Sequence, residues 1–418
     1  MPKIIFRIAL LLSICNFSAN AQTAWTIYKT SNSALLDNGI RAVSIDNNNH
    51  KWVGCAYGLG EYNDTTWTMY TTLNSGLPDD NILSIKTDKN NVKWIGTNNG
   101  GLVKFDGTNW TVWNTTNSGL PSDEIKCIAF DTSGNKWIGT ANGLVKFDDT
   151  NFTFWNHNNT PYFLIDIHDI AIDKNNVKYI SSLNSGLFYM TDTNFVQYNV
   201  SNSYLQDNFV FSIALDSSQN RWYGTAGKGI MSQHTDSITW EWYYPGNTPA
   251  DSAWTVNCIL IDSMQHKYMG SHLTGLVKYD GTNWTYWETY NSPMPNNKVN
   301  TIAQEKQGII WIGTDNGLAR FDESVPTNLE ENNTSSQVSI YPNPAKDKIN
   351  IILQSTNAGN VSLEILDIYG VLHLKTSLHT GNNFLSLPEN NFGSGIYFYR
   401  LNENGRVGRT SKLVVSNE

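Results

Sequence analysis

The strongest constraint on this chain is a four-residue element that returns along most of its length. It reads WVGC at 52–55, WIGT at 94–97 and 137–140, YISS at 179–182, WYGT at 222–225, YMGS at 268–271 and WIGT at 311–314. Successive copies begin 42, 43, 42, 43, 46 and 43 residues apart. A repeat of this length that contains four strand-like runs is typical of a β-propeller blade. The sequence therefore predicts an all-β fold whose main part is a seven-bladed propeller.

Each repeat unit divides into four short runs that favour strands. An alternating apolar run ending in an acid, such as ILSIKTD (82–88), precedes the WIGT run, and a Gly-containing turn leads to a third run, such as GLVKFD (101–106). An Asp-Gly or Asp-Asp hairpin then opens the fourth run, such as NWTVW (109–113). The seventh unit lacks a fourth run, but AWTIY (24–28) stands alone near the start. We expect residues 24–28 to pair with residues 317–322 and close the ring, because closure removes two open sheet edges.

The aromatic and sulfur-containing residues fit this repeat as core components. All 15 tryptophans lie between residues 25 and 311, and large rings suit the widening space between twisted blades. We expect six of them to fill the core: Trp52, Trp94, Trp110, Trp137, Trp284 and Trp311. The three cysteines of the repeats, Cys55, Cys127 and Cys258, stand where sister repeats carry small residues and are predicted to be buried fillers.

The lead-in N-S-G-L-P-x-[ND]-x-I (74–82, 117–125) and the core W-I-G-T-x-N-G-L-x-[KR]-F-D resemble the two-component-regulator propeller repeat. The resemblance covers residues 24 to 324. In that family the repeats form the periplasmic sensor of membrane-spanning histidine kinases, often in glycan-responsive systems of Bacteroidetes. Because this sequence shows neither a transmembrane helix nor a kinase region, the resemblance implies the binding scaffold and not the signalling role.

The first residues predict export. Lys3 and Arg7 precede a short apolar run, and Ala19-Asn20-Ala21 fits a small-x-small cleavage site, so residues 1–21 are expected to be a signal peptide. A lipid anchor through Cys15 is the alternative. No later segment reaches the ~18 apolar residues of a membrane span. The net charge of −9 argues against nucleic acid as a partner, because nucleic-acid binders present a basic surface.

The repeat stops after Phe321, and a different pattern follows. Residues 22–324 are thus assigned to the propeller, and residues 325–337 read as a polar linker. Short alternating runs joined by Asn/Gly turns then fill residues 338–418, which predicts a small β-sandwich.

The sandwich region resembles the C-terminal sorting domain of the Bacteroidetes type IX secretion system. The matching segments are YPNP (341–344), LEILDIYGVLHLKTSL (363–378), GSGIYFYRL (393–401) and KLVVS (412–416). The resemblance implies that residues 338–418 engage the type IX machinery, and that the protein is secreted or attached to the outer-membrane surface. An adhesive sandwich that stays on the chain is the alternative.

No motif of a known enzyme class or metal site is present, so neither a metal nor another cofactor is expected. The second position of the first run varies across the repeats as Arg41, Leu83, Lys126, His168, Phe211, Asn257 and Asn300, and we expect this ring of residues to face the channel entrance. The next position is small except at Asp169. A propeller-based polysaccharide lyase or hydrolase would need carboxylates or a His–acid pair, for which Asp166, His168, Asp169 and Asp251 are the candidates.

Aromatic residues in the loops favour a binding role for one rim of the propeller. The loops into blades four to six gain Tyr162, Phe163, Tyr204 and Trp254, and Tyr57 and His272 fall in loops on the same face. Exposed rings beside Asn and Asp suit stacking on sugars. With His168 and Asp169, these residues form the predicted site of a non-catalytic, surface-displayed protein that binds glycan. The alternatives are the rim enzyme and a protein–protein scaffold or adhesin.

Overall fold

The computed structural model describes residues 24–191, 194–236, 238–244, 254–325, 337–354, 361–367, 371–388, 391–403 and 406–416. Every regular element in these residues is a β-strand, which confirms the all-β prediction. Among them there is no helix with the length and apolar character needed to cross a membrane. The chain forms two compact units that divide after Val325. The predicted signal peptide and residues 326–336 of the predicted linker lie outside the described residues.

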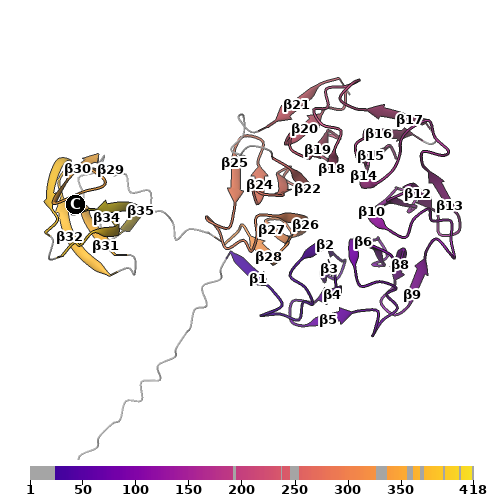
Figure 1. Ribbon diagram of the computed structural model, residues 1–418, viewed down its shortest axis with the longest axis horizontal. Coiled ribbons are helices and arrows are strands. Elements are labelled where there is room, and N and C mark those ends of the chain that lie inside the picture. The colour runs from indigo at the N-terminus through magenta and orange to yellow at the C-terminus, as the bar shows by residue number, and fades with distance from the viewer. Residues whose placement is uncertain are drawn as a thin grey trace, which may run out of the picture. The chain divides into compact units, whose positions relative to one another are not determined.

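The first unit contains seven four-stranded antiparallel sheets in a ring, with the first strand of each sheet toward the centre (Figure 1). The first strands are β2 Ile40–Ile45, β6 Ile82–Thr87, β10 Ile125–Phe130, β14 Ile167–Ile172, β18 Val210–Leu215, β22 Val256–Ile261 and β26 Val299–Lys306. The second strands are β3 Lys51–Cys55, β7 Lys93–Thr97, β11 Lys136–Thr140, β15 Lys178–Ser182, β19 Arg221–Thr225, β23 Lys267–Ser271 and β27 Ile309–Thr314.

The outer half of each sheet completes this arrangement. The third strands are β4 Gly58–Tyr62, β8 Leu102–Phe105, β12 Gly143–Phe147, β16 Gly186–Thr191, β20 Ile230–Gln233, β24 Leu276–Tyr279 and β28 Gly317–Asp322. The fourth strands are β5 Trp67–Tyr70, β9 Trp110–Trp113, β13 Phe152–Trp155, β17 Asn194–Tyr198, β21 Trp240–Tyr243, β25 Trp284–Trp287 and, in the seventh sheet, β1 Trp25–Tyr28.

The seventh sheet takes its strands from both ends of the first unit. β1 pairs antiparallel with β28, so that Trp25 lies opposite Phe321 and Tyr28 lies opposite Leu318. The rings of Trp25 and Phe321 stack with 4.3 Å between their centroids. Because β1 covers the outer edge of β28, this sheet has the same width as the other six.

An acid ends each first strand and organises the turn that follows. Asp131 shows the pattern: its Oδ1 accepts hydrogen bonds from the backbone amides of Ser133 and Asn135 at 3.0 and 2.9 Å. Its Oδ2 accepts a third bond from the indole of Trp137 at 3.0 Å. The same bond between a ring and the acid six residues earlier joins Trp52 to Asp46, Trp94 to Asp88, Tyr179 to Asp173, Trp222 to Asp216 and Trp311 to Glu305. The acid therefore fixes both the turn and the large ring of the second strand.

A buried cation then connects each of six sheets to the sheet before it. The Nζ of Lys93 lies 4.7 Å from the ring centroid of Trp52 in the preceding sheet and 2.9 Å from the Oδ2 of Asp46. The equivalent contacts place Lys136 over Trp94, Lys178 over Trp137, Arg221 over Tyr179, Lys267 over Trp222 and Lys51 over Trp311. Neighbouring sheets are thus joined by a desolvated cation–π contact that includes a carboxylate partner at several junctions.

The junction between the sixth and seventh sheets lacks this cation, because Ile310 stands in its place. There the hydroxyl of Tyr268 donates a hydrogen bond to Glu323 at 3.0 Å. The Nζ of Lys278 lies 2.7 Å from the same carboxylate and 5.3 Å from the ring of Tyr268. Lys278, from the third strand of the sixth sheet, therefore supplies the cation that the repeat omits here, and Glu323 supplies its carboxylate partner.

Most of the predicted core residues are buried, with a difference between strands. Trp52, Trp94, Trp137 and Trp311, all in second strands, are at most 2% exposed. Trp110 and Trp284, in fourth strands, are only half-buried and stack on the third strand of their own sheet. All three cysteines of the repeats are free thiols; Cys55 and Cys127 are buried and Cys258 is half-buried.

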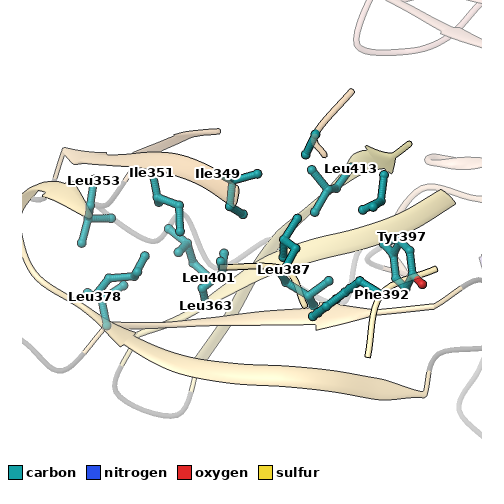
Figure 2. Close-up of a cluster of buried hydrophobic side chains, with 14 residues drawn as sticks. Ile349, Ile351, Leu353, Leu363, Leu378, Leu387, Phe392, Tyr397, Leu401 and Leu413 are labelled. Carbon is teal, nitrogen blue, oxygen red and sulfur yellow. The ribbon is translucent and has the colours of Figure 1, made fainter. Parts of the chain in front are cut away.

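The second unit is a sandwich of two antiparallel sheets. One contains β29 Gln337–Tyr341, β30 Lys348–Gln354 and β33 Gly381–Ser386; the other contains β31 Val361–Leu366, β32 Leu372–Leu378, β34 Gly395–Glu403 and β35 Arg406–Val415. Figure 2 shows the core between them, in which Ile349 and Ile351 of one sheet face Leu363 and Leu401 of the other. The predicted sandwich is therefore present in residues 337–416.

We predict that Lys93→Met lowers the free energy of unfolding of the propeller by about 3–5 kcal/mol, because it leaves the buried carboxylate of Asp46 without its cation. Urea denaturation followed by tryptophan fluorescence measures this, since every tryptophan lies before residue 312 and reports on the propeller alone. Lys174→Met, at an exposed turn position, is the control and should change the value by less than about 0.5 kcal/mol. Equal effects from the two variants would contradict a structural role for the buried cation.

Candidate functional site

The two sets of loops at one end of the ring form what we call the rim. They are the connections from each fourth strand to the next first strand, and from each second strand to the third strand. At this end every first strand carries a β-bulge, where the register shifts after its first residue. The bulge residues are Arg41, Leu83, Lys126, His168, Phe211, Asn257 and Asn300. Because a bulge releases its residue from the ladder, this ring of side chains is where the repeat can vary.

Two of the variable residues, Lys126 and His168, belong to a charged cluster beside the first strand of the fourth sheet. Lys126 makes an ion pair with Asp166 and a longer one with Glu124, at 3.4 Å. The Nε2 of His168 lies 3.8 Å from the Oδ2 of Asp166, and its ring packs edge-on against Phe211 at 5.1 Å. The structure thus brings together Asp166 and His168, two of the four candidate residues for an enzyme at this rim.

Electrostatics at the cluster favour the neutral form of His168. Burial lowers the pKa of His168, and the positive charge of Lys126 lowers it further, while Asp166 and Glu124 oppose both effects. A neutral imidazole beside an ammonium and a carboxylate can donate and accept hydrogen bonds at the same time. The cluster is therefore suited to polar recognition at neutral pH.

Asp169, the one acid in a column of small residues, bridges two sheets. Its Oδ2 accepts a hydrogen bond from the amide of Ile213 in the next sheet at 2.8 Å, and its Oδ1 accepts one from the amide of Ile170 at 2.9 Å. Burial raises the pKa of Asp169 in spite of these bonds. At the equivalent position Ser84 and Cys127 also bond to the next first strand, through its carbonyl groups. Asp169 therefore acts as a connection between sheets.

The structure separates the predicted rim residues into exposed and packed ones. Tyr57, Phe163 and Tyr204 are 64%, 60% and 69% exposed, and His272 is exposed as well. Tyr162 is half-buried; its hydroxyl donates to the carbonyl of Phe195 at 3.1 Å and its ring packs edge-on against Phe188. Tyr162 is thus packed against the third and fourth strands of the fourth sheet. Asp251 lies outside the described residues.

The expectation that Trp254 is an exposed rim aromatic is wrong. Its side chain is 0% exposed and packs among Trp222, Ile230, Val256 and Met269. In the other sheets the same slot holds the apolar residue of the lead-in: Leu35, Leu77, Leu120, Leu164, Leu205 and Met294. The sequence before Trp254 lacks the N-S-G-L-P motif, so the motif could not show that Trp254 takes the place of the buried leucine of the other repeats.

Two features of the structure were not predicted from the sequence. The cations before the WIGT element were visible as Lys or Arg in six of the seven copies, but their contacts with the preceding sheet depend on the ring arrangement. The second feature is a cavity of about 600 Å³ at the end of the ring opposite the rim, between the second and third sheets. No group of three or more His, Cys, Asp or Glu residues in the described part of the chain is arranged to hold a metal ion.

We predict that Trp254→Ala lowers the free energy of unfolding by about 3–5 kcal/mol, because the substitution leaves a large cavity in the core. Tyr204→Ala, at a 69% exposed position, should change it by less than about 0.5 kcal/mol. Denaturation of both variants tests the packing role, which a small effect of Trp254→Ala would refute.

A second prediction concerns the charged cluster. The pKa of His168, measured by NMR titration of its ring protons, should lie below the usual value near 6.5. Lys126→Met should raise this pKa because a nearby positive charge is lost, and Asp166→Asn should lower it because a negative one is lost. The spectrum of His168→Gln assigns the signal. Shifts in the same direction in the two variants would rule out the proposed charge interactions.

Two family models match parts of the chain, one in each unit. A family model described as a secretion system C-terminal sorting domain matches residues 339–416, and a two component regulator propeller model matches residues 293–316. No curated protein matches the sequence significantly.

Solved structures share the propeller fold at low sequence identity. PorZ, an essential surface component of the type IX secretion system of Porphyromonas gingivalis, is 19% identical with a TM-score of 0.56, over 91% of this chain and 60% of that one. The extracellular domain of BT3049 from B. thetaiotaomicron, assigned to a hybrid two-component system, is 15% identical with a TM-score of 0.66, over 95% and 58%. Virginiamycin B lyase from Staphylococcus aureus is 11% identical with a TM-score of 0.58, over 71% and 98%.

This chain spans about 60% of the length of the first two of these structures, and at such identities the likeness concerns the fold. The family matches also indicate where the protein is located, because the sorting domain places it among proteins that are secreted or held at the cell surface. The protein thus combines a β-propeller, in which residues 293–316 match the two component regulator propeller model, with a C-terminal secretion sorting domain at residues 339–416.

Proposed function

We propose that the propeller is a non-catalytic binding module that uses its rim, and that its ligand is a glycan. The type IX sorting domain delivers such a module to the outside of the cell, where polysaccharides are the abundant polymers. The observation that carries the proposal is the distribution of exposed apolar side chains over the ring.

Exposed large apolar side chains in the loops of the propeller gather at the rim. Those at the rim are Leu36, Tyr57, Leu73, Phe163, Val200, Tyr204, Phe209, Tyr244, Leu273 and Tyr290, whereas the turns at the opposite end carry Ile238 and Met264. Exposed apolar groups that gather on one surface mark an interaction site more often than scattered ones do. Aromatic rings among them can stack on the apolar faces of sugar rings.

The charged cluster supplies the polar half of such a site. Phe163 lies three residues before Asp166 in the same rim loop, and Asp166 contacts both Lys126 and His168. An ammonium, a carboxylate and an imidazole can each bond to sugar hydroxyls. A ring for stacking beside groups for hydroxyl recognition is the combination that a glycan site requires.

The same cluster keeps a second function open. Asp166 and His168 are a carboxylate and an imidazole 3.8 Å apart, which could serve as an acid–base pair in a lyase or hydrolase. Product formation would therefore distinguish an enzyme from a binding protein that uses the same residues.

We predict saturable binding of at least one glycan when the purified mature chain is screened against a polysaccharide panel by calorimetry. Phe163→Ala and Tyr204→Ala should each weaken it by about tenfold or more, as expected for the loss of a stacked ring. Ile238→Ala, which removes a 78% exposed side chain at the opposite end, is the matched control and should bind as the wild type does.

The incubated mixtures of protein and polysaccharide are then assayed for new reducing ends and unsaturated sugars. Binding without products supports the proposal, whereas products that disappear in His168→Gln would establish the enzyme. If no glycan binds, or if Ile238→Ala weakens binding as much as Phe163→Ala, the rim is not a glycan site and a protein partner becomes the alternative.

A further inference from the structure

Side-chain amides join the turns of neighbouring sheets at the end of the ring opposite the rim. Asn91 is the third residue after the acid of its turn, and its φ is 64°. Its Oδ1 accepts a hydrogen bond at 2.9 Å from the backbone amide of Asn47, the first residue after the acid in the preceding sheet. We call this contact the amide bridge.

The amide bridge recurs around the ring. Asn176 bonds to the amide of Thr132 at 3.0 Å, Gln219 to that of Lys174 at 3.3 Å and Gln265 to that of Ser217 at 2.8 Å. Side-chain contacts replace it at both junctions of the seventh sheet, where Ser263 bonds to Gln307 and Asn49 bonds to Glu305. Six of the seven junctions are therefore closed by an amide or carboxyl oxygen.

The junction between the second and third sheets is the exception. Gly134 stands where the amide side chain belongs, with a φ of 85°. Consequently the backbone N–H of Lys89, which is equivalent to that of Asn47, has no hydrogen-bond acceptor among the described residues. Lys89 is exposed, so water satisfies this N–H in the free protein, and a ligand oxygen that enters the adjoining cavity can replace that water.

The cavity of about 600 Å³ lies at this junction and is lined by both Lys89 and Gly134. The equivalent cavity between the fourth and fifth sheets, where Gln219 makes the bridge, measures about 410 Å³. The larger volume falls within the range of small-molecule sites. The junction that lacks the amide side chain, at Gly134, thus has the larger of the two cavities and a Lys89 N–H without a protein acceptor.

The walls of the cavity indicate what else the ligand must carry. The half-buried rings of Trp113 and Phe130 line it and offer an apolar surface. Lys104 and the 61% exposed carboxylate of Asp149 also line it, and Lys104 makes no ion pair with any residue that the structure describes. The cavity therefore combines an N–H donor, an aromatic wall and polar groups of both charges.

We propose that this cavity is a second binding site, separate from the rim, for a sugar that carries an acetamido group. The acetamido carbonyl accepts the hydrogen bond of the Lys89 N–H and so replaces the oxygen that Asn91, Asn176, Gln219 and Gln265 supply at other junctions. The apolar face of the sugar ring packs on Trp113 and Phe130, and its hydroxyls bond to Lys104 and Asp149. An acetamido sugar is the class that unites an amide carbonyl, a flat apolar face and hydroxyls.

The test compares two disaccharides that differ in this group, N,N′-diacetylchitobiose and cellobiose, by calorimetry on the full mature chain. The expected result is that the acetylated sugar binds at least tenfold more tightly. Gly134→Asn installs the missing side chain at a position where asparagine is already accommodated in other turns, and an added Cβ there meets nothing within 4 Å. It should weaken binding at least tenfold while Tm stays the same or rises.

Two control variants distinguish binding in this cavity from binding elsewhere on the propeller. Gly308→Asn makes the same change at the matching turn position of the seventh sheet, which is equally open, and should bind as the wild type does. Ile238→Ala, at an exposed turn of the same end of the ring but outside the cavity, should also bind as the wild type does. Gly134→Gln, which introduces the side chain found at Gln219, should repeat the loss.

No saturable binding by the wild type would overturn the proposal, as would equal affinity for the two sugars or full binding by both Gly134 variants.

Discussion

The structure depends on one contact that is repeated around the ring: a cation at the start of a second strand lies over an aromatic ring of the preceding sheet. At the first junction the carboxylate that holds the ring also pairs with the cation, so Asp46, Trp52 and Lys93 form one desolvated unit. Burial would raise the pKa of Asp46, but hydrogen bonds from Lys93, Trp52 and the His50 amide lower it overall. The carboxylate therefore stays charged, and it stabilises the propeller above the pKa of an unfolded aspartate and less as the pH falls.

This contact leaves the two ends of the ring free to differ. The residue types in the strands are constrained because each strand contributes to a contact between sheets. The bulges at the rim and the turns at the other end are not constrained in this way. Variation gathers there: His168 and Lys126 occur at bulges, and Gly134 interrupts the amide bridges in one turn. A repeated scaffold can thus carry one rim site and a separate pocket at the opposite end, which are the two sites proposed above.

The candidate site shows which residues a sequence can place and which it cannot. The repeat register located the rim, and Tyr57, Phe163 and Tyr204 are exposed there. It misplaced Trp254, because the N-S-G-L-P motif that marks the buried leucine in other repeats is absent from the loop before Trp254. It could not assign Asp169 either, because the partner of that carboxylate is an amide of the next sheet, 44 residues away.

The sequence by itself determined the all-β class, the repeat of four strands and the sorting domain, because each of these is written in local patterns of apolar residues, turns and motifs. Only the tertiary structure decided how the sheets meet. Residues of different sheets make the contact of each cation with its ring and form the pocket beside Gly134. The exposure of a rim aromatic also depends on the neighbouring sheet. Such contacts depend on the closed ring and its packing, and a side chain is committed to the core or to solvent only when its neighbour from another sheet is in place.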